Sequence, residues 1–247
     1  LFRSSCVFLQ FQFSWSSGGF IPPANPAVLG PGHRQKVDAP CGMLKYSITI
    51  QCAMQVFFPK SRVKFPVLSE FVRVPQQPDE DLFIEYFNQH PEVKLIIAPH
   101  VIDENHLVEI IRKLKRPYVR YTRADEKNVR KADCLIIDCF GLLSSIYRYG
   151  EIAYIGGGFG VGIHNTLEAA VYGIPVIFGP KYQKFQEAVQ LLEAKGGFSV
   201  KSYEELKALL DRMLEDESFL RETGTNAGTY VTGNAGATDK VLGMINF

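Results

Sequence analysis

The feature that most constrains the fold is the stretch at residues 151–180, which reads EIAYIGGGFGVGIHNTLEAAVYGIPVIFGP. Its apolar start, at residues 152–155, is typical of a strand buried on both faces, and the glycines that follow predict a sharp turn. Polar residues then open a helix that ends near Gly173, and residues 175–178 predict the next parallel strand. The stretch therefore predicts one βαβ unit, whose strand-to-helix turn is a place where open α/β sheets bind ligands.

The residues of this turn suit an anionic ligand. Gly157 and Gly158 allow close approach to the backbone. Unpaired N–H groups at the start of the following helix favour a phosphate. Structural interpretations stay open, because Asn165 and Glu168 have the spacing of a capping box and a lone histidine such as His164 is more often structural than catalytic. The glycine spacing does not match the dinucleotide fingerprint Gly-x-Gly-x-x-Gly, so it is weak evidence for NAD.

The same stretch resembles a known family. The string Gly-Gly-x-Phe-x-x-Gly-x-His-Asn-x-Leu-Glu-Ala-Ala, followed by Gly-Ile-Pro-Val-Ile-Phe-Gly-Pro, is similar to the donor-binding half of Kdo transferases. These enzymes transfer 3-deoxy-D-manno-octulosonic acid (Kdo) from CMP-Kdo to a lipid A precursor in lipopolysaccharide biosynthesis. The specific part is a combination of three pairs: His164-Asn165, Leu167-Glu168 and Gly179-Pro180. Other two-domain glycosyltransferases share only the Glu and the Gly-x-Pro part, so the resemblance implies the carboxy-terminal half of a GT-B glycosyltransferase.

The resemblance also implies a set of donor-binding or nucleotide-binding residues. They are His100, Asp138, Gly141, Gly157, Gly158, Phe159, His164, Asn165, Glu168, Gly179 and Pro180. Glu168 would accept hydrogen bonds from the two ribose hydroxyls, while glycine N–H groups and the helix start would stabilise the charge on the leaving phosphate. Two positions depart from the family pattern, since His100 stands where Arg is frequent and Leu142 replaces a Glu. Asp138 could equally be a simple turn or helix cap.

The implied reaction is inverting glycosyl transfer that uses no bound metal and no cofactor. A general base must deprotonate the acceptor hydroxyl, and in this family that base lies in an amino-terminal domain that no segment of the chain resembles. The catalytic residues are therefore unassigned, and we expect an incomplete, donor-binding half that is inactive alone. Two alternatives stay open: another GT-B enzyme that uses a UDP-sugar, and a non-catalytic nucleotide-binding fragment. The family works at the cytoplasmic face of the bacterial inner membrane, which implies peripheral membrane association of the complete protein.

Charge divides the chain into two parts. Residues 1–77 carry eight Lys and Arg against two Asp and Glu, whereas residues 78–247 carry 19 against 24. The first part also holds eight of the 14 prolines and predicts loop or disorder, apart from strand-like pieces at 47–50 and 53–58. We expect the family sequence to begin near Pro78, after a truncated, fused or wrongly framed segment. Residues 78–247 then form the CMP-Kdo-binding domain.

Beyond Pro78 the pattern alternates between helix and strand, which predicts one doubly wound, Rossmann-like α/β domain. Helices are expected at 79–88, 103–115, 182–194, from Ser202 through Met213, and at 234–247; strands are expected at 94–98, 118–121, 134–137 and 198–200. The Ser202–Glu205 spacing predicts a capping box at the start of this helix. The apolar face of the helix is expected to consist of Leu206, Leu209, Leu210 and Met213.

Composition limits the possible partners. Hydrophobic residues make up 46% of the chain, and the formal net charge is +1. No segment has basic residues interleaved with aromatic ones, so nucleic acid is not an expected partner. No run approaches the ~18–20 apolar residues of a membrane span. Cys134 and Cys139 flank a predicted buried strand, where reduced thiols and a cytosolic compartment are expected.

Overall fold

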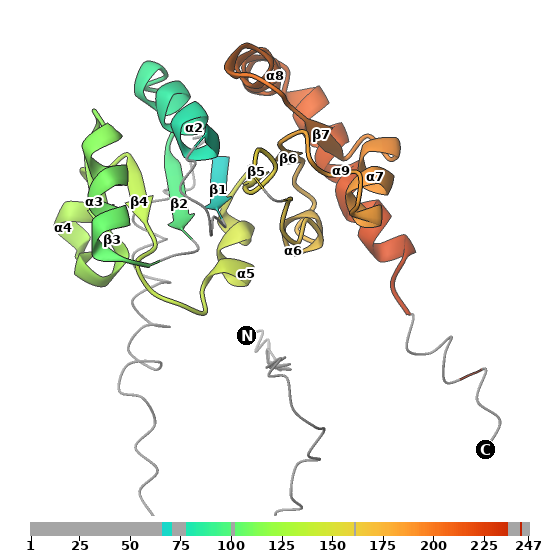
Figure 1. The fold of residues 1–247 in the computed structure, drawn as a ribbon, viewed down its shortest axis with the longest axis horizontal. Helices are drawn as coiled ribbons and strands as arrows, with labels where there is room; N and C mark the ends of the chain where they lie inside the picture. The colour runs from blue at the N-terminus through green and yellow to red at the C-terminus, as the bar shows by residue number, and fades with distance from the viewer. Residues whose placement is uncertain (1–65, 71–77, 100–101, 161, 237–242, 244–247) are drawn as a thin grey trace, which may run out of the picture. The chain divides into compact units, whose positions relative to one another are not determined.

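The computed structural model of the chain describes residues 66–70, 78–99, 102–160, 162–236 and 243. Within them, seven strands form one sheet in the order β3-β4-β2-β1-β5-β6-β7, and all neighbouring strands are parallel (Figure 1). The strands are β1 (Pro66–Glu70), β2 (Leu95–Pro99), β3 (Tyr118–Arg120), β4 (Cys134–Ile136), β5 (Ile152–Ile155), β6 (Val176–Phe178) and β7 (Gly197–Ser199).

The strand order places a topological switch point at the centre of the sheet. From β1 the chain proceeds to β2 on one side, and it later returns to β5 on the other side. Ser69 of β1 is in register with Ile155 of β5, so both strands end at the same edge. Because ligands of open α/β sheets bind beyond the carboxyl ends of the strands at such a point, this edge is where a site is expected.

Helices cover both faces of the sheet, as expected for a doubly wound fold. They are α2 (Pro78–Gln89), α3 (Glu104–Lys113), α4 (Glu126–Val129), α5 (Leu143–Ile146), α6 (Leu167–Ala170), α7 (Gln186–Glu193), α8 (Tyr203–Glu215) and α9 (Glu217–Gly233), with single 3-10 turns η1 (Tyr121–Arg123) and η2 (Tyr147–Tyr149). Buried side chains of α2, α3 and α8 pack on one face, and those of α5, α6 and α7 on the other. Figure 1 shows α2 and α8 above the sheet and α5 and α6 below it.

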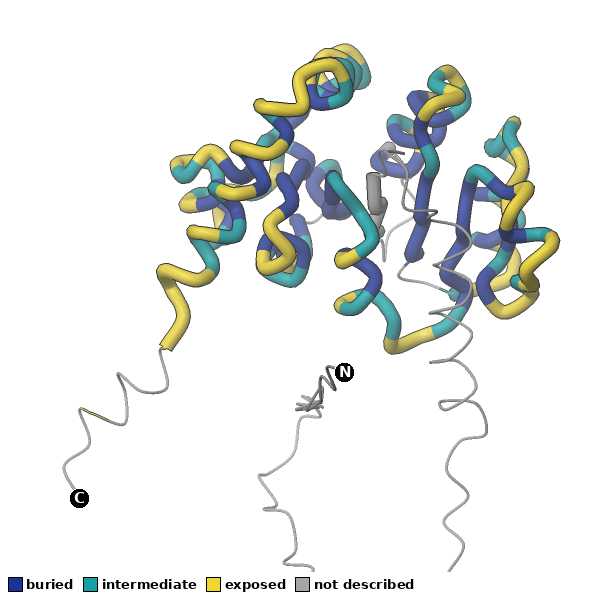
Figure 2. The backbone as a smooth tube through the Cα atoms, turned by 180° about the vertical axis from the view of Figure 1, so that it is seen from behind, coloured by how far each residue is buried: buried dark blue, intermediate teal, exposed yellow. Residues whose placement is uncertain are grey.

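Alternating side chains divide the core into these two layers. Ile96 and Ala98 of β2 belong to one buried cluster, whereas Leu95 and Ile97 belong to the other. Successive strand residues point to opposite faces, so a strand covered on both sides must be apolar throughout. The consequence is that β2, β4, β5 and β6 are buried along their whole length, and Figure 2 shows exposed positions on the outer sides of the helices.

Two helix starts that the sequence predicted are confirmed. Asp103 caps α3 by accepting hydrogen bonds from the backbone N–H groups of Asn105 and His106, at 2.9 and 3.3 Å. Ser202 caps α8 by accepting the Glu205 N–H at 3.3 Å. The predicted capping box would also have the Glu205 carboxylate accept the backbone N–H of Ser202. In the structure this carboxylate accepts the N–H of Lys201 instead, one residue earlier in the chain.

The predicted α/β class is confirmed, but the sheet starts earlier than the predicted boundary at Pro78. β1 lies before that residue and pairs with both β2 and β5. The five residues PVLSE include a Pro, a Ser and a Glu, so they carry little strand signal of their own. Residues 1–65 and 71–77, with the strand-like pieces predicted at 47–50 and 53–58, lie outside the described residues.

The carboxy-terminal helix also differs from the prediction. The structure has α9 at residues 217–233, a segment where no helix was expected, and 234–236 are not helical. The remainder of the short helix predicted at 234–247 lies outside the described residues, except for residue 243. Small residues explain why a segment rich in Gly and Thr packs as a helix: a Cβ on Gly224 would stand 2.3 Å from the Gly173 carbonyl oxygen. Close packing of α9 on that turn therefore outweighs the low helix propensity of glycine.

Other predictions concern membranes, metals and thiols. Among the described residues, no helix combines the length and apolarity needed to cross a bilayer, and no group of three His, Cys, Asp or Glu residues is placed to hold a metal ion. Cys134 is buried and Cys139 half-buried, and both are free thiols in this structure.

Candidate functional site

The turn between β5 and α6 folds back on itself. Gly157 has a φ of +91° and Gly162 a φ of +141°, which are conformations that side chains rarely adopt. The Gly157 carbonyl accepts the N–H groups of Gly160 at 2.9 Å and of Gly162 at 3.1 Å. These two N–H groups are therefore used inside the turn.

The turn packs directly on the loop that follows β6. A Cβ on Gly158 would stand 2.5 Å from both the N and the Cα of Gly179, so the two backbones touch. Lys181 joins the same loops, because its backbone N–H donates to the Gly158 carbonyl at 2.9 Å and its Nζ donates to the Gly160 carbonyl at 2.8 Å. Gly158 and Gly179, predicted as donor-binding residues, thus have a packing role of their own: they allow the two loops to meet.

A buried carboxylate that the sequence analysis missed supports this turn. Asp79, in the first turn of α2, is 1% exposed, and its Oδ2 accepts the Gly157 N–H at 3.2 Å. It also accepts hydrogen bonds from the Tyr154 hydroxyl and from the Phe159 N–H. Burial raises the pKa of Asp79, and the three hydrogen bonds oppose that shift. Its acidic neighbours made it resemble an ordinary first-turn carboxylate, and no local signal revealed a partner 78 residues away.

Asn165 and Glu168 form a connected pair at the start of α6. The Asn165 Oδ1 accepts the Leu167 N–H at 3.1 Å, and its Nδ2 donates to the Glu168 Oε1 at 3.1 Å. The predicted capping box is therefore altered, because Glu168 accepts from the Asn165 side chain and not from its backbone. A carboxylate offers about four lone-pair sites, so the half-buried Glu168 retains acceptor capacity for a ligand.

His164 lies beside the glycine turn. Its Nε2 would be 3.2 Å from a Cβ on Gly157, so the ring packs against a position that must lack a side chain. The half-buried ring stands next to the exposed Asn165. This arrangement brings an imidazole to the same turn as the Asn165–Glu168 pair.

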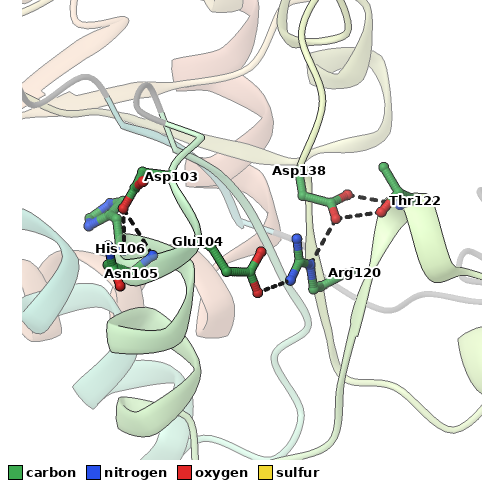
Figure 3. A network of polar contacts seen from close by, with 7 residues as sticks. All are labelled: Asp103, Glu104, Asn105, His106, Arg120, Thr122 and Asp138. Carbon is green, nitrogen blue, oxygen red and sulfur yellow. Dashed lines mark hydrogen bonds and ion pairs between the residues drawn. The ribbon is translucent and has the colours of Figure 1, made fainter.

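Asp138 belongs to a separate polar cluster at the end of β4, which Figure 3 shows. Its side chain is fully buried and accepts hydrogen bonds from Arg120 Nε at 2.8 Å and from the backbone N–H and hydroxyl of Thr122, at 2.8 and 2.6 Å. Arg120 also pairs with Glu104 at 2.6 Å. Burial alone would raise the pKa of Asp138, but the hydrogen bonds from Thr122 and Arg120 outweigh it and hold the pKa below its ordinary value. Asp138 therefore ties β4 to β3 and η1, and it is neither a helix cap nor exposed.

The predicted site residues consequently form two groups. Eight of them gather beyond β5 and β6: Gly157, Gly158, Phe159, His164, Asn165, Glu168, Gly179 and Pro180. Asp138 and Gly141 follow β4, which β2 and β1 separate from β5. His100 lies outside the described residues. The eight residues thus lie together at the switch point, whereas the Asp138 carboxylate is bonded to Arg120 and Thr122, and the donor-binding role of both groups stays a prediction.

A cavity of about 370 Å³ lies elsewhere, on α2 and the end of α3. Its lining is Asp81, Ile84, Glu85, Asn88, Gln89, Lys113 and Lys115. Its polar side chains bond to each other and to nearby backbone, as in the Asp81–Lys113 ion pair at 2.6 Å. The cavity shares no residue with the switch-point site.

No protein-family model matches the chain. A 3-deoxy-D-manno-octulosonic acid transferase of Aquifex aeolicus is 36% identical over 134 residues, which are 53% of this chain and 36% of that protein. A transferase of the same name from Rickettsia bellii is 26% identical over 204 residues, covering 70% of this chain and 49% of that one. The chain thus spans between about a third and a half of these relatives.

Solved structures confirm the fold. The C-terminal CMP-Kdo binding domain of WaaA from Acinetobacter baumannii superimposes with a TM-score of 0.62 at 17% identity, covering 76% of this chain and 98% of that domain. At this identity the likeness concerns the fold, which is that of a GT-B glycosyltransferase domain. The resemblance that the sequence indicated is confirmed: the chain is similar to the carboxy-terminal half of a Kdo transferase.

Proposed function

We propose that residues of β1 to α9 form the donor-binding half of a Kdo transferase, which holds CMP-Kdo while Kdo passes to a lipid A precursor. The observation that carries the proposal is the sequence similarity to several curated Kdo transferases. The Glu168 carboxylate, oriented by Asn165 beyond the end of β5, supports it because a nucleotide site is expected at this switch point.

Within this site, Glu168 accepts hydrogen bonds from the ribose hydroxyls. Asn165 donates to Oε1 and thereby orients the carboxylate, which leaves acceptor positions for two hydroxyl groups. The N–H groups of Gly157, Gly160 and Gly162 are already bonded within the protein, so they do not serve the leaving phosphate. We assign that contact to His164, which packs against the same turn and can donate a hydrogen bond to a phosphate oxygen.

The other parts of the reaction belong to the complete enzyme. A base that deprotonates the acceptor hydroxyl and a surface that binds the lipid are assigned to a second domain, which would pack over the carboxyl edge of the sheet. We propose further that the complete protein is a peripheral protein of the cytoplasmic face of the inner membrane, as the resemblance to Kdo transferases implies. The relatives, of which the chain covers 36% and 49%, have length for such a domain.

Nucleotide choice tests the donor assignment. In saturation-transfer NMR with the full chain, CMP should give strong difference signals, whereas UMP and UDP at the same concentration should give weak ones. Glu168→Ala should reduce the CMP signals, and Glu187→Ala, on the nearby α7, serves as the matched control that retains them. Stronger signals from UDP would favour a GT-B enzyme that uses a UDP-sugar.

An activity assay tests the assignment of the catalytic base to a second domain. The full chain, incubated with CMP-Kdo and a lipid A precursor, should release no CMP above the uncatalysed rate, because no residue assigned here acts as the base. Turnover by this chain would show that the base lies within it.

A further inference from the structure

The carboxylate of Asp79 accepts three hydrogen bonds at the switch point. It lies in the first turn of α2, is 1% exposed and accepts hydrogen bonds from β5, through the Tyr154 hydroxyl, and from the glycine turn, through the N–H groups of Gly157 and Phe159. One side chain thus joins the start of α2, a central strand and the turn that carries the candidate site.

We propose that Asp79 is a positioning residue for the donor site: it holds the glycine turn in the conformation that places His164 and Glu168 for the nucleotide. This inference rests on the proposed function, because it presumes that the turn binds CMP-Kdo. Asp79 itself is buried beneath the turn and does not touch the ligand.

The contacts of the turn explain how Asp79 acts at a distance. Gly157, whose N–H donates to Asp79, has a carbonyl that accepts two further N–H groups of the turn. A Cβ added to Gly157 would stand 3.2 Å from His164 Nε2, so the imidazole lies close to this residue. Gly158 follows directly and meets the loop after β6 through Gly179. Displacing the Gly157 peptide group would therefore shift the imidazole and loosen the contact between the two loops.

Chemistry explains why a carboxylate is needed at this position. The two carboxyl oxygens of Asp79 accept hydrogen bonds from three converging donors. In an Asp79→Asn variant, the amide NH₂ group would replace one acceptor oxygen with donors. If the NH₂ group faces the turn, a buried N–H group loses its partner; if it faces the Tyr154 hydroxyl, which can turn to accept from it, one neutral amide oxygen must hold the turn in place of the carboxylate. Either change weakens the contact between residue 79 and the glycine turn.

The test compares two neighbouring substitutions in the full chain. Asp79→Asn should weaken CMP binding, measured by calorimetry on folded protein, by about tenfold or more, since sub-ångström displacement of binding groups has effects of this order. Asp81→Asn, two residues along the same helix with a 56% exposed side chain, should leave the dissociation constant within about twofold. A folded Asp79→Asn protein with unchanged CMP affinity would overturn the proposal.

A measurement on the unaltered protein covers the case in which Asp79→Asn fails to fold. Hydrogen exchange followed by NMR should show that the Gly157 and Phe159 amides exchange slowly before CMP is added and that CMP protects them no further, because Asp79 already binds them. Fast exchange without CMP, or protection that appears only with CMP, would contradict the inference. Absence of CMP binding by the unaltered protein would instead refute the proposed function, so the two failures are distinguishable.

Discussion

At the scale of single residues, the glycines of the switch point matter most for how closely two loops approach. Gly158 and Gly179 are in direct backbone contact, and Gly162 lies where a Cβ would meet the Phe185 ring at 2.8 Å. Close contact between backbones cannot be relieved by a rotamer change. Glycines that indicate a ligand site in the sequence can therefore be required first for the close packing of two backbone segments.

Gly158→Ala tests this packing role. The added Cβ would be 2.5 Å from backbone atoms of Gly179, so we expect a loss of roughly 3 kcal/mol or more in the free energy of unfolding, measured by denaturant titration. Gly160→Ala is the matched control, because its Cβ would meet only the Gly157 carbonyl oxygen, at an ordinary 3.5 Å. Equal stability of the two variants would refute the packing role.

At the scale of elements, buried ionic contacts join helices and strands at the carboxyl edge. Asp138 links β4 to β3 and η1, and Glu80 links α2 to α3 through His106 Nε2 at 2.7 Å and the more distant Lys113 Nζ at 3.9 Å. Each carboxylate has a fully or almost fully buried side chain, so its partners offset a substantial desolvation cost. Removing one partner should therefore cost more than removing an exposed ion pair.

Asp138→Asn tests the first link. The substitution leaves the Arg120 side chain, which is 12% exposed, without its buried counter-charge, and we expect about 3 kcal/mol of destabilisation at neutral pH. Glu104→Gln removes the exposed partner of the same guanidinium and should cost less than about 1 kcal/mol. The pKa of Asp138 lies below its ordinary value of 3.8, so its contribution should be lost as the pH falls below that value. A similar cost for both variants would contradict this account.

His106→Gln tests the second link through its pH dependence. The hydrogen bond to Glu80 raises the pKa of His106 above its ordinary value of 6.5. The stabilisation from the charged imidazole is therefore complete below pH 6.5 and is lost as the pH rises through the higher, folded-state pKa. Unfolding curves should show the unaltered protein roughly 1–2 kcal/mol more stable than the variant at low pH, and the two should converge at higher pH. A difference that grows with pH would be inconsistent with this link.

At the scale of the whole molecule, the proposed nucleotide site lies where the strand order of the described sheet reverses. The sequence predicted the βαβ unit from β5 to β6 because its apolar runs, glycines and helix start are all local signals. It missed β1, whose residues pair with distant strands, and α9, whose small residues make it helical through packing on Gly173. Within the site, Asn165 and Glu168 could be predicted from their spacing, whereas Asp79 could not, because its partners in the turn are remote in sequence.

The central claim is that the full chain binds the donor nucleotide through Glu168 at the carboxyl edge of β5. Isothermal titration with CMP tests it most directly, using the unaltered chain and Glu168→Ala. We predict saturable binding of CMP, with weaker binding of UMP and UDP, and a loss of at least about tenfold in CMP affinity for the variant, in line with the removal of hydrogen bonds to a charged acceptor. Equal CMP affinity in both proteins, or no binding by the unaltered chain, would contradict the account.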